Sequence, residues 1–159
     1  QDVATIYPKL LKHYDKTIDK NSVLYDGIVP VLKGLKDDGW ALGVCTNKPE
    51  FQANLLLTIL GIRSYFKSFI GADTIGVPKP SPKPLFAAIE RAGGDKNLSV
   101  LVGDTKTDCD TAKAANVKSL LVNYGHGALT QDLSALNPDA LVDRVDEIPK
   151  TLEKLLTGL

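Results

Sequence analysis

Residues 100–110, VLVGDTKTDCD, place three acidic side chains directly after an apolar run: Asp104, Asp108 and Asp110. A carboxylate at the carboxyl end of a buried strand is well placed to bind a hard cation such as Mg²⁺, which prefers oxygen ligands. Gly103 lets the backbone approach closely at this point. The segment therefore predicts a metal site at Asp104.

The same acids also fit the start of a helix. Thr107 is predicted as the N-cap, which puts Asp108 and Asp110 in the first turn, where the helix dipole favours carboxylates. Capping explains Asp110 best, competes with a functional role for Asp108, and leaves Asp104 unexplained because that residue precedes the cap. A calcium-binding loop is excluded because Lys106 occupies a ligand position and the required glycine is absent.

Two other segments carry groups that suit a phosphate. In TNKP, residues 46–49, the Thr46 hydroxyl, the Asn47 N–H and the following helix N-terminus could seat a phosphate, although a simple N-cap explains the same tetrapeptide. In GVPKPSPKPLF, prolines on both sides of Lys79 stiffen the loop. Lys79 would lend positive charge to a phosphate and the carboxylates; the alternative is a solvated surface lysine. Lys83 is expected in the next helix's first turn, with Ser81 as its cap.

The cysteines and histidines are weaker candidates for a functional site. Cys45 lies in an apolar strand and is predicted to be core packing, and Cys109 has no histidine near it in sequence, so a cysteine hydrolase is not indicated. His126, between two glycines, could lie at the mouth of a site or simply be exposed, and His13 is assigned no role. Neither GxGxxG nor GxxxxGK[ST] occurs, which removes the main support for dinucleotide and P-loop sites.

Alternating helical and strand patterns would bring the first three segments together. Helical spacing and apolar runs predict helices through 31–35, 51–60, 85–89, 112–115 and 148–156, and strands at 40–45, 68–73, 98–104, 119–125 and 140–143. This order predicts an α/β fold with a doubly wound parallel sheet, whose ligands bind beyond the carboxyl ends of the strands. An amphipathic helix is expected before it, over residues 1–20.

Composition narrows the partner. The 159 residues suit one domain, and 19 basic residues balance 19 acidic ones, so neither a nucleic acid nor a membrane surface is indicated and a small molecule is expected. Two cysteines far apart in sequence form no disulfide framework, and no apolar run is long enough to span a bilayer, so we expect a cytoplasmic protein. The chain starts with Gln1, and we expect that it lacks its true beginning.

Three segments in register, VCTNKP, KPSPKPL and VLVGDTKTDCDTAKAANV, resemble the second, third and fourth motifs of the haloacid dehalogenase superfamily, specifically its phosphoglycolate phosphatase branch. The similarity runs from about Tyr25 to the C-terminus. It implies a Rossmann-like phosphatase core over residues 21–159, with residues 1–20 similar to the end of a helical cap.

The resemblance also implies a mechanism: Mg²⁺-dependent hydrolysis of a phosphate monoester through an aspartyl-phosphate. Thr46, with the Asn47 backbone, would hydrogen-bond the phosphoryl oxygens, and Lys79 would neutralise charge on the phosphate and the nucleophile. Asp104 would bind Mg²⁺, and Asp108 would support the metal shell or orient Lys79. The metal and the lysine would stabilise charge on the transferring group.

One part of the family pattern is missing. The nucleophile belongs to a DxDGT-like first motif after an N-terminal strand that is central in the sheet, and nothing here matches it; DCD at 108–110 is followed by Thr111 and Ala112 instead of Gly-Thr. We therefore expect the C-terminal part of a longer enzyme, inactive alone, whose partner is its missing N-terminal segment. The first expected substrate is 2-phosphoglycolate; the alternatives are a sugar-phosphate mutase or phosphatase and a noncatalytic phosphate-binding or regulatory module.

Overall fold

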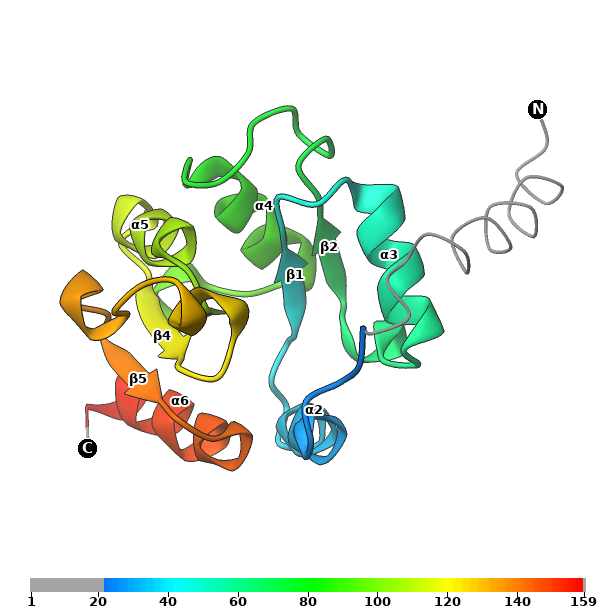
Figure 1. Cartoon of the computed structure of the whole chain (residues 1–159). Coiled ribbons are helices and arrows are strands. Elements are labelled where there is room, and N and C mark those ends of the chain that lie inside the picture. Colours follow the sequence, from blue (N-terminus) through cyan, green and yellow to red (C-terminus); the bar gives the residue numbers. More distant parts are fainter. Residues whose placement is uncertain (1–21, 159) are drawn as a thin grey trace, which may run out of the picture.

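The computed structural model describes residues 22–158, in which helices alternate with strands (Figure 1). The strands are β1 (Gly43–Cys45), β2 (Ser68–Ile70), β3 (Val100–Gly103), β4 (Lys118–Val122) and β5 (Ala140–Val142). The α-helices are α2 (Ile28–Asp37), α3 (Glu50–Ile59), α4 (Lys83–Ala92), α5 (Lys106–Ala115) and α6 (Ile148–Thr157). The predicted α/β fold is confirmed, while the helix expected over residues 1–20 lies outside the described range.

Short 3₁₀ turns complete the chain: η1 (Arg63–Tyr65), η2 (Lys96–Leu98), η3 (His126–Leu129), η4 (Ser134–Leu136) and η5 (Val145–Glu147). Between residues 22 and 158, no helix has the length and apolar character that crossing a membrane would require.

The strands form two separate parallel sections instead of one sheet. β1 pairs with β2, and β3, β4 and β5 pair in that order, with Leu120 of β4 opposite Val102 of β3 and Ala140 of β5. Figure 1 shows the two sections on either side of the molecule, with α2 below the space between them. The predicted parallel sheet is present, but it is interrupted between β1 and β3.

Helices cover both faces, which is what makes the strand sequences nearly continuous apolar runs. On one face α2 and α6 contribute Leu35, Ile148 and Leu152 to a core cluster with Leu120 of β4. On the other face α4 and α5 contribute a second cluster: Leu85, Ala112 and Ala115, packed with Leu101 of β3 and Val117.

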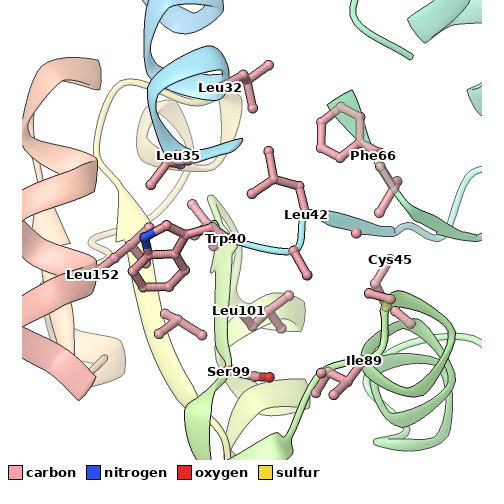
Figure 2. A pocket seen from close by; sticks show the side chains of 18 of the residues that line it. Leu32, Leu35, Trp40, Leu42, Cys45, Phe66, Ile89, Ser99, Leu101 and Leu152 are labelled. Atoms are coloured by element: carbon pink, nitrogen blue, oxygen red, sulfur yellow. The ribbon is translucent and has the colours of Figure 1, made fainter. Parts of the chain in front are cut away.

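A groove of about 660 Å³ occupies the interruption between β1 and β3. Its lining is mostly apolar and comes from α2, β1, α4, β3 and α6, as the labelled side chains show in Figure 2: Leu35, Cys45, Ile89, Leu101 and Leu152. The strands beside it are open: Val102 of β3 is 41% exposed, whereas Leu120 of the neighbouring β4 is 0% exposed.

The start of α5 differs from the sequence prediction. Thr105, not Thr107, is the N-cap: its hydroxyl accepts the Asp108 N–H, and the Asp108 carboxylate accepts the Thr105 N–H, which completes a capping box. Thr107 was an equally good candidate on spacing, since each threonine precedes an aspartate by three residues. The prediction was wrong because β3 ends at Gly103, which makes the earlier threonine the first residue able to cap.

Candidate active site

A second cavity, of about 430 Å³, opens where β1 and β3 end. Four of the five predicted site residues line it: Asn47, Lys79, Asp104 and Asp108. Thr46 does not line it but lies between Cys45 and Asn47, and its hydroxyl oxygen accepts the Lys48 N–H at 3.1 Å. Segments far apart in sequence therefore meet at one edge, as expected for the carboxyl ends of parallel strands.

The centre of this cavity is an ion pair between Lys79 and Asp108. Lys79 Nζ lies 2.6 Å from Asp108 Oδ1, and the two side chains are only 10% and 9% exposed. Burial by itself would raise the pKa of Asp108, but the Lys79 ammonium and the hydrogen bonds from Thr105 and the Asp104 N–H hold that pKa below its usual value. Asp108 is thus an ionised partner that fixes the Lys79 ammonium at the cavity.

The second carboxylate, Asp104, is supported by the loop after β4. The Gly127 N–H donates to Asp104 Oδ2 at 3.2 Å. A Cβ at Gly127 would lie 1.6 Å from the Asp104 carbonyl oxygen, and one at Gly125 would lie 2.5 Å from Asp104 Cβ, so only glycine fits at either place. From the sequence, only His126 was considered as a site residue in this loop. The glycines on either side of it are the residues that contact Asp104.

Of the two carboxylates at this edge, only Asp104 has an oxygen available as a ligand for Mg²⁺. Among the described residues, Asp104 Oδ1 makes no hydrogen bond and is therefore free to bind a cation. Both Asp108 oxygens are engaged, Oδ1 by Lys79 and Oδ2 by Thr105 and the Asp104 N–H, which favours orientation of Lys79 over direct metal binding. Within residues 22–158, no group of three or more histidine, cysteine or acidic side chains could hold a metal. One carboxylate, completed by water and phosphate oxygens, is a pattern that Mg²⁺ accepts.

The cysteines offer no nucleophile here. Burial raises the pKa of the Cys45 thiol; Lys79 lowers it and Asp108 raises it, with a net upward shift. Cys109 is 0% exposed and its thiol lies 3.5 Å from the Leu136 carbonyl oxygen. Both cysteines are free, and the upward shift of the Cys45 pKa fits the packing role predicted for that residue.

Known proteins resemble this chain over most of its length. A sequence model described as haloacid dehalogenase-like hydrolase matches residues 1–122. Phosphoglycolate phosphatase of Mesorhizobium japonicum is 33% identical, with 98% of this chain and 69% of the relative covered. Phosphoglycolate phosphatase of Colwellia psychrerythraea is 35% identical over 97% of this chain and 66% of the relative.

Solved structures give the same result. The crystal structure of a predicted phosphoglycolate phosphatase from Haemophilus somnus superposes with a TM-score of 0.80 at 28% identity, covering 87% of this chain and 61% of that one. The chain thus spans about two thirds of the length of the proteins it matches, 61% to 69% in these three cases. The chain belongs to the family of haloacid dehalogenase-like hydrolases.

Proposed function

We propose that the whole protein is a phosphate monoester hydrolase, with 2-phosphoglycolate as the first candidate substrate. The observation that carries this proposal is the buried Lys79–Asp108 ion pair next to Asp104 at a shared strand edge. The substrate is suggested by the similar proteins, which are named phosphoglycolate phosphatases. A small phosphorylated metabolite fits the size of the cavity, and a cation held by Asp104 would offset the negative charge that this carboxylate adds to the lining.

Each residue has a role that its contacts support. The Thr46 hydroxyl, whose oxygen accepts from Lys48, keeps its proton to donate to a phosphoryl oxygen, as does the Asn47 N–H. Lys79, fixed by Asp108, places a positive charge where charge develops on the transferring group. Asp104 is the proposed Mg²⁺ ligand. Hydrolases of this family generally use Mg²⁺, which supplies Lewis-acid stabilisation of phosphoryl oxygens.

The nucleophile is proposed to come from a segment that is not among residues 22–158, inserted as a strand between β1 and β3. The edge of β1 supports this insertion. The Leu42 carbonyl accepts the Lys67 N–H at 2.8 Å, and the Thr46 N–H donates to the Ile70 carbonyl at 2.9 Å. Because alternate residues of a parallel strand turn to the same neighbour, the backbone groups of Gly43 and Cys45 face the groove.

The groove also has the direction and chemistry that suit a strand. Cys45 of β1 and Val102 of β3 line both the groove and the site cavity, and Trp40 and Leu98, which precede these strands, line the groove as well. The two strands therefore run in the same direction, and an inserted parallel strand of about six residues would span roughly 20 Å. Apolar side chains on both faces require an apolar strand, whose carboxyl end would arrive beside Lys79 and Asp104.

A peptide probe tests this insertion. The probe is a hexapeptide of valine and isoleucine flanked by lysines, compared with two versions N-methylated at odd or at even positions. Alternate N–H groups of a strand face opposite neighbours, so each version loses donors to only one side. In calorimetric titrations of the 159-residue chain, we expect both N-methylated peptides to bind at least tenfold more weakly than the unmethylated peptide. If either N-methylated peptide bound as tightly as the unmethylated one, the peptide would pair with only one of the two strands, or would bind without backbone pairing. Either result would refute the insertion.

A matched pair of substitutions localises that binding. Leu98 lines the groove and is 66% exposed, whereas Leu129 is 80% exposed and does not line it. Leu98→Glu is expected to weaken the peptide, and Leu129→Glu is expected to leave its affinity unchanged. The opposite ranking would place the peptide elsewhere on the surface.

The catalytic proposal is tested with the intact protein and two substrates. We expect Mg²⁺-dependent phosphate release from 2-phosphoglycolate and little from glucose 1-phosphate. The reverse preference would favour a sugar-phosphate enzyme, and binding of inorganic phosphate without turnover of either ester would favour a noncatalytic module.

We also propose a cytoplasmic location, supported by the two free cysteines, which a reducing compartment preserves. The neutral balance of 19 basic and 19 acidic residues supports a small-molecule partner over a nucleic acid or a membrane. We also propose that this chain divides into a helical cap remnant at 1–20 and a phosphatase core, without its first strand, at 21–159.

A further inference from the structure

Residues 75–81, the part of the β2–α4 loop that carries Lys79, are held to the protein by few polar contacts, whereas residues 72–74 of the same loop bond to Lys48 and Glu50. Pro78 and Pro80 have no N–H, so Lys79 supplies the only backbone donor of the three residues. Among the described residues, the hydrogen bonds that join 75–81 to elements other than its own helix α4 involve Asn47 and Asp108 alone. Proline restricts the shape of this loop but does not attach it to β1 or α5.

The Asn47 side chain makes that attachment at two points. Asn47 Nδ2 donates to the Lys79 carbonyl oxygen at 3.0 Å, and Asn47 Oδ1 accepts the Lys79 N–H at 2.8 Å. The Asn47 amide therefore binds both backbone groups of Lys79. This fixes the orientation of the amide, because a flipped amide would place its NH₂ against the Lys79 N–H and its oxygen against the Lys79 carbonyl.

The attachment lies at the base of the Lys79–Asp108 pair. From the clamped backbone, the Lys79 side chain reaches Asp108, with 2.6 Å between Nζ and Oδ1. Asp108 is itself fixed by the capping box at the start of α5. Lys79 is thus held at two points: Asn47, which follows β1, binds its backbone, and Asp108 of α5 binds its ammonium. The Asn47 contact sets where the side chain begins.

We propose that Asn47 is a positioning residue, whose side-chain amide fixes the backbone of Lys79 so that its ammonium is directed at the reacting phosphate. This role is separate from that of the Asn47 N–H, because replacing the side chain leaves that backbone donor in place. The catalytic consequence rests on the proposed phosphatase function, whereas the clamp itself rests on hydrogen bonds that need no substrate.

Hydrogen exchange tests the clamp without any assay of activity. In the intact protein with ¹⁵N-labelled lysine, we expect the Lys79 amide to exchange at least tenfold faster in Asn47→Ala than in the parent. Asn47→Asp, which keeps the shape and one acceptor but loses the donor, should give a smaller increase and guards against loss of folding. The matched control is Asn123→Ala: like Asn47, Asn123 lies just beyond the end of a strand, is exposed, and has a side-chain hydrogen bond of its own, to Asp143 at 2.8 Å.

Two results would overturn the proposal. The first is Lys79 exchange that is unchanged in both Asn47 variants, which would mean that the clamp does not hold. The second is faster exchange throughout α4 and α5 to the same degree, which would mean that Asn47 merely stabilises the fold.

Kinetics then test the consequence. With 2-phosphoglycolate and Mg²⁺, kcat of Asn47→Ala should fall at least tenfold and by more than KM rises, while Asn123→Ala retains kcat. An unchanged kcat despite faster Lys79 exchange would refute the positioning role. Absence of turnover in the parent would instead refute the phosphatase proposal, and exchange would still decide whether the clamp exists.

Discussion

Asp108 and Asp110 lie two residues apart on α5, and each pairs with a lysine, yet the two pairs have different environments. Asp108 and its partner Lys79, from a distant loop, are 9% and 10% exposed at the site cavity. Asp110 and Lys106, one helical turn apart, are 38% and 63% exposed. The same residue types therefore form a long-range pair that fixes the Lys79 ammonium at the site cavity and a local pair on a solvated surface. Burial and the origin of the partner, not charge spacing, separate them.

The sharpest contrast between the two lysines should be in catalysis. Lys79→Met removes the cation directed at the phosphate, so kcat of the intact protein with 2-phosphoglycolate should fall by about 10³-fold. Lys106→Met removes only an exposed lysine and should leave kcat within about twofold. Equal losses in the two variants, measured by phosphate release, would contradict the difference in role.

The two aspartates should differ next in stability. Asp108→Asn leaves the nearly buried Lys79 ammonium without its partner and should lower the free energy of unfolding by about 3 kcal/mol. Asp110→Asn breaks an exposed pair and should cost less than about 0.5 kcal/mol. Urea unfolding followed by circular dichroism checks both, and a cost for Asp110→Asn as large as that for Asp108→Asn would refute the comparison.

Acid should remove the stability that the Asp108 pair provides. The pKa of Asp108 is lower in the folded protein than its unfolded value of about 3.9, so the unfolded chain binds more protons between the two values. The contribution is therefore complete above the unfolded value and is lost as pH falls through the folded pKa. Thermal unfolding between pH 6 and pH 3 should show a shallower acid decline in Asp108→Asn than in the parent; parallel curves would argue against an ionised, paired Asp108.

The two threonines before these aspartates should show the smallest contrast. Thr105→Ala removes the N-cap of α5 and should destabilise the protein by about 1 kcal/mol. Thr107→Ala, on the first turn of the same helix, should change stability by only a few tenths of that, because Thr107 is not the cap. A larger effect at Thr107 in urea unfolding would restore the capping assignment made from sequence spacing.

The sequence was sufficient where local pattern determines the structure. Apolar runs located the core of all five strands described here, and proline and strand ends located Asn47, Lys79, Asp104 and Asp108 near one edge. The parallel arrangement followed from the alternation of elements, because parallel strands require helical crossovers. These predictions depend on neighbours in sequence or on general rules of chain topology.

Other features depend on contacts between distant segments and could not be predicted from local pattern. The Asn47 side chain binds the backbone of a residue 32 positions away, and Gly127 donates to Asp104 across 23 positions. The N-cap of α5 was ambiguous because two threonines had the same spacing to an aspartate, and the end of β3 decided between them. The interruption between β1 and β3 appears only when the pairing of strands is known.

Phosphate release by the intact protein, with and without Mg²⁺, tests the proposed role of this edge most directly when parent, Asp104→Asn and Asp110→Asn are compared. We predict Mg²⁺-dependent hydrolysis of 2-phosphoglycolate by the parent and by Asp110→Asn, and a loss of at least 10³-fold in Asp104→Asn with its fold retained by circular dichroism. Full Mg²⁺-dependent activity in Asp104→Asn would contradict the assignment of the metal site to this carboxylate.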